Sequence, residues 1–128
     1  MDKPRPTNRQ ILIVEDSLDI QQLLSHFLEK SGYSVVCAAN GIEALEILRS
    51  GPGLPKLIIL DIMMPEMDGF QFLAEQEKDS KIAGIPVVAM TADKTAETRA
   101  LHAGVKAFLR KPFTEVEFIL RTIEQFLR

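Results

Sequence analysis

One stretch of this sequence restricts the possible folds more than any other. The run Leu57–Leu60 is apolar without interruption, and Asp61 follows it directly. Such a run is typical of a strand that is buried on both faces. Pro65 cannot continue a hydrogen-bonded ladder, and Asp68-Gly69 is a turn signal, so the strand ends near Asp61. A carboxylate at that place must meet water, a cation or a reacting partner, because burying it alone costs too much.

Similar runs alternate with helix-like patterns along the rest of the chain. The predicted strands are Gln10–Val14, Val35–Ala38, Leu57–Asp61, Ile85–Met90 and Ala107–Leu109. Doubly buried strands that alternate with helices favour a parallel sheet with helices on both faces. We therefore predict an α/β fold of the doubly wound, flavodoxin-like (βα)5 class, with the strand order 2-1-3-4-5.

Each intervening segment carries apolar residues at helical spacing. The third predicted helix runs from about Gly69 to Asp79, and the fourth runs from about Thr95 to Ala103. The fourth helix is rich in alanine, so it is expected to bury the least apolar surface and to be the element that moves most easily. The large side chains expected to face the core from the first four helices are Ile20, Leu23, Leu24, Phe27, Leu28, Ile42, Leu45, Leu48, Phe70, Leu73 and Leu101.

Length and composition fit one domain. The chain has 128 residues and a formal net charge of −3, with no basic stripe, which argues against direct binding of nucleic acid. No apolar run approaches a membrane span. Residues 1–9 are polar and broken by proline, so we expect a flexible N-terminal arm before a domain over residues 10–128. Cys37 is the single cysteine, which excludes an internal disulfide and suits the cytoplasm.

Polar side chains follow the predicted strands where each strand ends. They are Glu15, Asp16, Asp61, Thr91 and Lys111. The carboxyl ends of parallel strands share one edge of the sheet, so these groups are expected to converge there. Three like charges repel unless some are protonated or a cation binds. Carboxylate oxygens without histidine or cysteine suit a hard ion, Mg²⁺ above all, and a carboxylate beside Mg²⁺ and a lysine can accept a phosphoryl group.

With these motifs the chain resembles the receiver domain of two-component response regulators, of the chemotaxis-type single-domain kind. The resemblance runs from about Gln10 to Arg128. The motifs that carry it are Glu15-Asp16, Asp61 with Pro65 and Gly69, Thr91-Ala92, and Lys111-Pro112.

The resemblance implies a role for each of these positions. Asp61 is the expected site of phosphorylation. Asp16, Asp61 and the main-chain carbonyl of Met63 are the expected ligands of Mg²⁺, for which Mn²⁺ could substitute, and Glu15 is expected to act through water. Lys111 is expected to bind the phosphoryl oxygens.

It also implies a switch. Thr91 and the main chain of Ala92 are expected to bind the phosphoryl group, and Thr91 and Phe108 are expected to move together. The Lys111-Pro112 peptide bond is expected to be cis. Met63 and Asp93 occupy variable positions that would tune the lifetime of the phosphoryl group.

The implied donor is a sensor histidine kinase or a histidine phosphotransfer protein. The implied binding face for a downstream protein or output domain is the fourth helix, the fifth strand and the last helix; dimerisation stays open. Two other functions compete with this one. A phosphatase of the haloacid dehalogenase type would need a second aspartate where Met63 stands, so turnover of a substrate is not expected. An inert interaction module would not need the complete acidic set.

Overall fold

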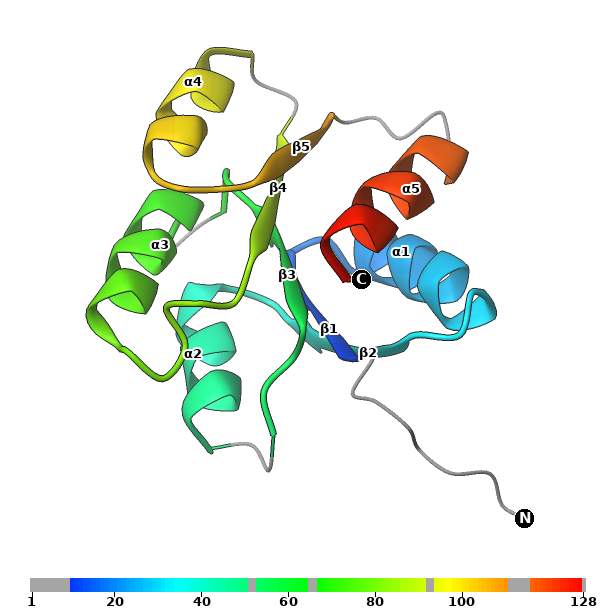
Figure 1. Cartoon of the computed structure of the whole chain (residues 1–128), viewed down its shortest axis with the longest axis horizontal. Helices are drawn as coiled ribbons and strands as arrows, with labels where there is room; N and C mark the ends of the chain where they lie inside the picture. Colours follow the sequence, from blue (N-terminus) through cyan, green and yellow to red (C-terminus); the bar gives the residue numbers. More distant parts are fainter. Residues whose placement is uncertain (1–9, 51–52, 65–66, 92–93, 111–115, 128) are drawn as a thin grey trace.

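The computed structural model describes residues 10–50, 53–64, 67–91, 94–110 and 116–127. Strands and helices alternate throughout these residues (Figure 1). The elements are β1 (Gln10–Val14), α1 (Leu18–Lys30), β2 (Ser34–Ala38), α2 (Gly41–Ser50), β3 (Leu57–Asp61), α3 (Gly69–Lys78), β4 (Val87–Thr91), α4 (Lys94–His102), β5 (Ala107–Arg110) and α5 (Val116–Leu127).

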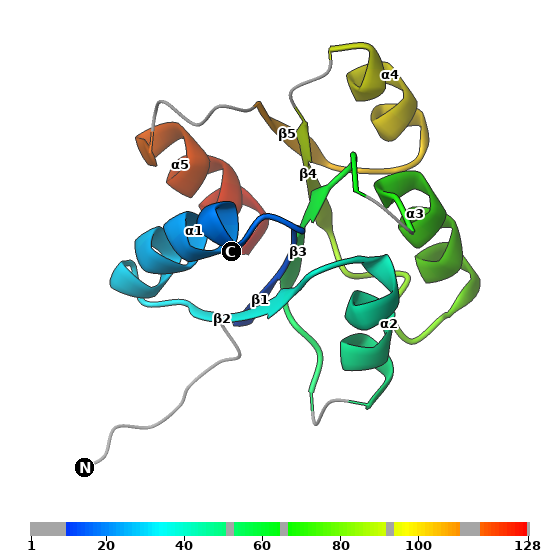
Figure 2. The same ribbon diagram turned by 180° about the vertical axis from the view of Figure 1, so that it is seen from behind.

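The strands form one parallel sheet in the order β2-β1-β3-β4-β5, which confirms the predicted fold and strand order. In both views, α1 and α5 cover one face of this sheet and α2, α3 and α4 cover the other (Figures 1 and 2). Successive strand residues alternate between the two faces, so Leu12 packs with α2 and α3, whereas Ile13 packs with α1 and α5. Residues 11–14 and 57–60 are buried, as the apolar runs predicted, and Asp61 is buried with them.

Local hydrogen bonds fix where the helices begin. Ser17 is the N-cap of α1, and its side chain accepts a hydrogen bond from the N–H of Ile20. Asp68 and Gln71 form a capping box at the start of α3, in which each side chain accepts the main-chain N–H of the other residue. These contacts satisfy N–H groups that the first helical turn leaves without partners. The helix starts are therefore set by short polar residues between the apolar runs.

β4 differs from its prediction, because it spans Val87–Thr91 rather than Ile85–Met90. The N–H of Ile85 bonds to the carbonyl of Ile82 within the preceding turn, so it is not available to the sheet. Pro86 has no N–H, and it contributes only its carbonyl, to the N–H of Ile58. The ladder thus starts one residue after the proline.

Three side chains that were predicted to face the core are substantially exposed. Leu23, Ile42 and Leu101 are 41%, 46% and 54% exposed. On α3 the buried face includes Phe72, which is fully buried, and Gln76, whose side-chain amide donates to the carbonyls of Ile82 and Ile85 at 2.9 and 3.0 Å. The apolar residues of a helix form a stripe rather than a line. Helical spacing alone can therefore assign a neighbouring residue to the buried face by mistake.

α4 is held to the rest of the molecule by small contacts. Among its side chains that the structure describes, Ala96 and Ala100 are buried. The guanidinium of Arg99 lies 3.9 Å from the centre of the Phe70 ring on α3, a cation–π contact. The expectation that Leu101 anchors this helix was wrong, since Leu101 points to solvent.

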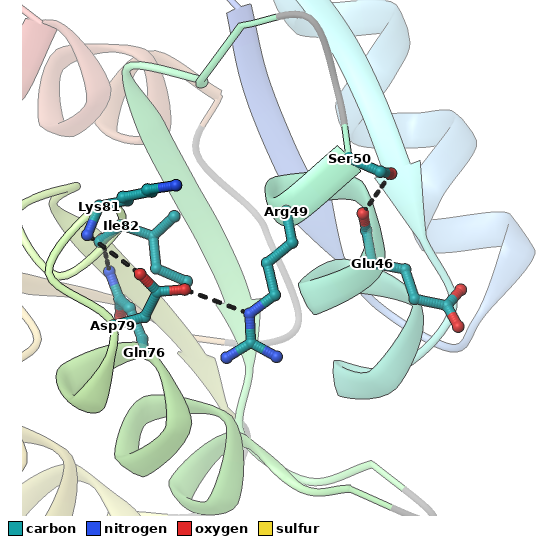
Figure 3. A network of polar contacts seen from close by, with 7 residues as sticks. All are labelled: Glu46, Arg49, Ser50, Gln76, Asp79, Lys81 and Ile82. Carbon is teal, nitrogen blue, oxygen red and sulfur yellow. Dashed lines mark hydrogen bonds and ion pairs between the residues drawn. The ribbon is translucent and has the colours of Figure 1, made fainter.

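A polar network ties α2 to α3 where both helices end (Figure 3). Arg49 Nε donates to Asp79 Oδ2 at 3.2 Å, and the N–H of Lys81 donates to Asp79 Oδ1 at 3.0 Å. The Lys81 N–H, and after it the Arg49 guanidinium, hold the pKa of the Asp79 carboxyl below its ordinary value of 3.8.

The parallel topology places chain ends together. Every helix runs back to the end of the sheet where the strands begin, so α5 finishes at the same end at which β1 starts. In the part of the chain that is described, no helix combines the length and the hydropathy needed to cross a bilayer.

Candidate functional site

The acidic residues come together at the opposite end of the sheet, where the strands finish. β1 and β3 are neighbours, with Val14 paired to Leu60, so the residues that follow them are adjacent. Glu15, Asp16 and Asp61 each place a carboxylate oxygen within 4.8 Å of the other two. Glu15 and Asp61 are 1% and 3% exposed, whereas Asp16 is exposed. The predicted convergence of these three side chains is confirmed.

Hydrogen bonds from the main chain orient two of the carboxylates. The N–H of Ser17 donates to Glu15 Oε2 at 3.0 Å, and the N–H of Met63 donates to Asp61 Oδ1 at 3.1 Å. The Gln21 side chain donates from Nε2 to the carbonyl oxygen of Glu15 at 2.6 Å. The bonds to the two carboxylates each join residues two positions apart, so the loops after β1 and β3 hold their own acidic side chains.

The loop after Asp61 is closed by direct contact between main chains. The N–H of Gly69 donates to the carbonyl of Ile62 at 2.9 Å. A Cβ atom at residue 69 would lie 2.7 Å from the Cα of Ile62 and 3.2 Å from the carbonyl oxygen of Asp61. Only glycine allows α3 to begin this close to the strand that carries Asp61.

Thr91 and Phe108 lie on the two strands beyond β3. Thr91 is 1% exposed and is the last residue of β4, one position beyond Met90, which pairs with Asp61. Phe108, on β5, pairs with Ala89 of β4 and is half-buried. It packs against the apolar cluster that contains Ala96 and Ala100 of α4. Thr91 therefore stands at the acidic edge, and Phe108 touches the cluster on which α4 rests.

Several predicted site residues lie outside the described residues. They are Ala92, Asp93, Lys111 and Pro112, so the Lys111-Pro112 peptide bond and the phosphoryl-binding lysine stay predictions. Met63 is described; it is 60% exposed, and its main-chain N–H donates to Asp61 Oδ1.

The cluster has the chemistry of a divalent cation site. All of its ligand atoms are carboxylate oxygens, which suit Mg²⁺ and similar hard ions. Two of the carboxylates are removed from water, so a bound cation would offset the repulsion between them. The donor set therefore fits Mg²⁺. Sequence reasoning missed Gln21, whose reach back from the first turn of α1 is visible only once the helix is placed against β1.

Residues 11–123 match the family model described as the response regulator receiver domain. Among curated proteins, the chain is 35% identical over 121 residues to the polar-differentiation response regulator DivK of Brucella anthropi, covering 93% of this chain and 96% of DivK. It is 30% identical over 128 residues to the sensor histidine kinase CheAY of Helicobacter pylori, covering 98% of this chain but 16% of CheAY. It likewise spans only 50% of the response regulator Rre1 of Synechocystis.

Solved structures agree with this match. The chemotaxis protein CheY4 of Vibrio cholerae has a TM-score of 0.85 at 32% identity, covering 94% of this chain and 100% of that one. The receiver domain of the sensor histidine kinase PA1611 of Pseudomonas aeruginosa has a TM-score of 0.83 at 27% identity, covering 94% and 98%. That structure is described as holding a magnesium ion in its active site cleft.

Proposed function

Because the chain belongs to the receiver domain family of response regulators, we propose that the Asp61 carboxylate is the group that accepts a phosphoryl group. Receiver domains are phosphoacceptor switches of two-component signalling, and they bind Mg²⁺ at an acidic pocket. The observation that carries the proposal is the meeting of Asp61 with Glu15 and Asp16, within 4.8 Å, at the edge where the strands end.

The proposed reaction is a transfer from a phosphohistidine. An Asp61 oxygen attacks phosphorus, a P–O bond forms, and the P–N bond to the donor imidazole breaks, with the electron pair leaving on the imidazole nitrogen. The N–H of Met63 donates to Asp61 Oδ1, which orients the carboxylate before the attack. The product is a mixed anhydride, an aspartyl phosphate, on this chain.

Asp16, Asp61 and the main-chain carbonyl of Met63 would hold Mg²⁺ or Mn²⁺, with Glu15 acting through water. When bound, the ion offsets the negative charge of the carboxylates and of the incoming phosphoryl oxygens. The Glu15 carboxylate is held next to Asp16 and Asp61, because its Oε2 accepts the N–H of Ser17.

The phosphoryl group would then be bound by the Thr91 hydroxyl, the main chain of Ala92 and the ammonium of Lys111. It adds roughly two negative charges and three acceptor oxygens at neutral pH. Thr91 and Lys111 gain their phosphoryl contacts only in that state, so phosphorylation favours one of two arrangements. We propose that Phe108 follows Thr91, because it packs on the cluster that also carries α4.

Receiver domains interact with histidine kinases and with downstream proteins. For this chain we propose a sensor histidine kinase or a histidine phosphotransfer protein as the donor, acting in the cytoplasm. A downstream protein or output domain would bind the face of α4, β5 and α5, and dimerisation stays open. Leu101 on α4 is 54% exposed, which supports that face. We propose no turnover of an independent substrate, only slow loss of the chain's own phosphoryl group.

One experiment separates the three functions that the sequence leaves open. The chain is treated with acetyl phosphate and Mg²⁺, and the intact mass and released phosphate are followed, with Asp61→Asn as the control. The proposal expects at most one phosphoryl group per chain, none in Asp61→Asn, and little released phosphate. Many turnovers would indicate a phosphatase, and no modification would indicate an inert module; either result contradicts the proposal.

A further inference from the structure

The turn between β1 and α1 carries two of the three acidic residues. Both the main-chain N–H and the main-chain carbonyl of Glu15 in this turn are hydrogen-bonded. The N–H of Glu15 donates to the carbonyl of Ala38 on β2 at 3.0 Å. The carbonyl of Glu15 accepts the hydrogen bond from Gln21 Nε2 at 2.6 Å. A carbonyl can only accept, so the nitrogen of the Gln21 amide must be the atom that faces it.

We propose that Gln21 is a positioning residue for the acidic site, and that its side chain sets the affinity of the site for Mg²⁺. The inference rests on the proposed function, because it takes the acidic cluster as the magnesium site. The carbonyl of Glu15 and the N–H of Asp16 belong to one planar peptide group. A hydrogen bond to that carbonyl therefore fixes the orientation of the peptide from which the Asp16 side chain extends.

The place of Gln21 in the fold explains the geometry. Its own N–H donates to the carbonyl of Ser17, so the residue is part of the first turn of α1. Side chains in a helix lean toward the N-terminus, which here is the direction of the acidic turn. The side chain is half-buried, so its amide is partly shielded from competing water.

The chemical type of residue 21 also matters. A lysine or arginine could donate to the carbonyl, but it would place a permanent positive charge beside the carboxylates and compete with the metal ion. A glutamate would set a negative oxygen against the carbonyl. The glutamine amide donates without a net charge, so it holds the turn and leaves the charge of the acidic cluster for the cation.

The test compares two adjacent glutamines. Gln21→Met keeps the length of the side chain and removes the donor, while Gln22→Met makes the same change at an exposed position of α1. Methionine is a good helix former, so α1 is expected to be retained. Mg²⁺ binding is measured by isothermal titration calorimetry, and unfolding by urea is measured in a chelator. Gln21→Ala is measured in parallel, so a folding defect of one variant does not decide the result.

Outer residues that orient metal ligands contribute about 10- to 100-fold to affinity. Asp16, the carboxylate on which Gln21 acts, is exposed, so we place Gln21 at the lower limit, roughly tenfold. We expect the Mg²⁺ dissociation constant to rise by that factor in both Gln21 variants and to stay unchanged in Gln22→Met. In metal-free protein, the amide ¹⁵N resonance of Asp16 should shift in the Gln21 variants only. A purely structural role would lower metal-free stability without changing Mg²⁺ affinity.

Two outcomes overturn different claims. If the parent chain binds Mg²⁺ and both Gln21 variants bind it equally well, Gln21 does not position the site and the proposed function stands. If the parent chain itself neither binds Mg²⁺ nor accepts a phosphoryl group from acetyl phosphate, the proposed function fails, and the inference fails with it.

Discussion

Gly69 shows how closely the site depends on single residues. Replacement by alanine would place a Cβ atom 2.7 Å from the Cα of Ile62, which is main chain and cannot rotate away. Alanine is the better helix former, yet overpacking of this kind costs about 1–3 kcal/mol. We expect Gly69→Ala to lower the free energy of unfolding by about that amount, measured by urea unfolding followed by circular dichroism.

Gly84 supplies the matched control for this change. A Cβ atom at residue 84 meets nothing within 4 Å, so Gly84→Ala should leave stability unchanged or slightly higher. Equal stability of the Gly69→Ala and Gly84→Ala variants would contradict this prediction. It would show that the loop after Asp61 can move away from the added Cβ atom without a loss of stability.

Met63 is predicted to set the lifetime of the phosphoryl group. Its side chain is apolar, 60% exposed and two residues after Asp61, so we expect it to orient an attacking water poorly. Met63→Asn supplies an amide there and keeps the main-chain N–H to Asp61. We expect autodephosphorylation to accelerate about tenfold, which corresponds to ~1.4 kcal/mol in activation free energy. The rate is measured by release of phosphate from the purified phosphorylated chain.

Leu18→Asn is the control for that rate, because Leu18 is 67% exposed in the first turn of α1 and lies outside the loop of Asp61. It should dephosphorylate at the rate of the parent chain. An unchanged or slower rate in Met63→Asn would reject the role of Met63. Asp93 is proposed to act on the same lifetime, and it lies outside the described residues.

At the level of single residues, the acidic cluster was predictable because the sequence shows where the buried strands end. An apolar run that stops at a carboxylate places that carboxylate at the sheet edge, whatever packs around it. The bond from Gln21 to Glu15 and the contact of Gly69 with Ile62 were not predictable in the same way. Both depend on how a helix is placed against a strand, which spacing along the chain does not encode.

Among the helices and strands, α2 and α3 are joined by an ion pair that depends on pH. The pKa of the Asp79 carboxyl is lowered by the N–H of Lys81 and by Arg49, so its charged form is favoured in the folded chain. A lowered pKa adds stability above the ordinary value of 3.8, and that stability is lost as the pH falls through the folded value.

We therefore expect Asp79→Asn to be less stable than the parent chain at pH 7, and the difference to shrink below about pH 3.8. Asparagine still accepts the N–H of Lys81, so the change tests the charge. Urea unfolding of both proteins at pH 7 and at a pH below about 3.8 measures the difference in stability. Glu75→Gln breaks the exposed pair with Lys78 and should change little at either pH. A deficit of equal size at both pH values would contradict the role of the charge.

The predicted order and type of these elements are confirmed, but their faces were less predictable. α4 was expected to be weakly packed because it is rich in alanine, and Ala96 and Ala100 are indeed its buried contacts among the described side chains. Leu101 was predicted to anchor α4 because it is the large apolar side chain of that helix. The structure instead shows a cation–π contact between Arg99 of α4 and Phe70 of α3, which hydrophobic spacing cannot reveal. The predicted start of β4 at Ile85 was wrong, because Pro86 is compatible with a strand end as well as with a turn.

For the molecule as a whole, the like charges of Glu15, Asp16 and Asp61 are expected to repel one another less once a cation is bound. Mg²⁺ that binds only the folded chain adds about 2.7 kcal/mol at a concentration 100 times the dissociation constant. We expect the melting temperature to rise with Mg²⁺ and to fall when the ion is chelated, measured by differential scanning calorimetry. Removing one of the three repelling charges by Asp61→Asn should raise the melting temperature in chelator and reduce the gain from Mg²⁺.

Glu29→Gln removes a charge from the exposed end of α1, away from the cluster, and controls for a general effect of net charge. It should show the gain from Mg²⁺ that the parent chain shows. A metal-free Asp61→Asn variant that melts below the parent chain would argue that the three carboxylates do not repel strongly in the fold.

The common end of the sheet at which β1 starts and α5 finishes has a practical consequence. A fluorophore, an affinity tag or a fused reporter joined next to Gln10 or Leu127 would sit on the side of the molecule remote from Asp61. Such attachments should leave the approach of a phosphoryl donor unobstructed. Energy transfer between dyes at the two junctions would then measure the separation of the start of β1 and the end of α5 without perturbing the chemistry at Asp61.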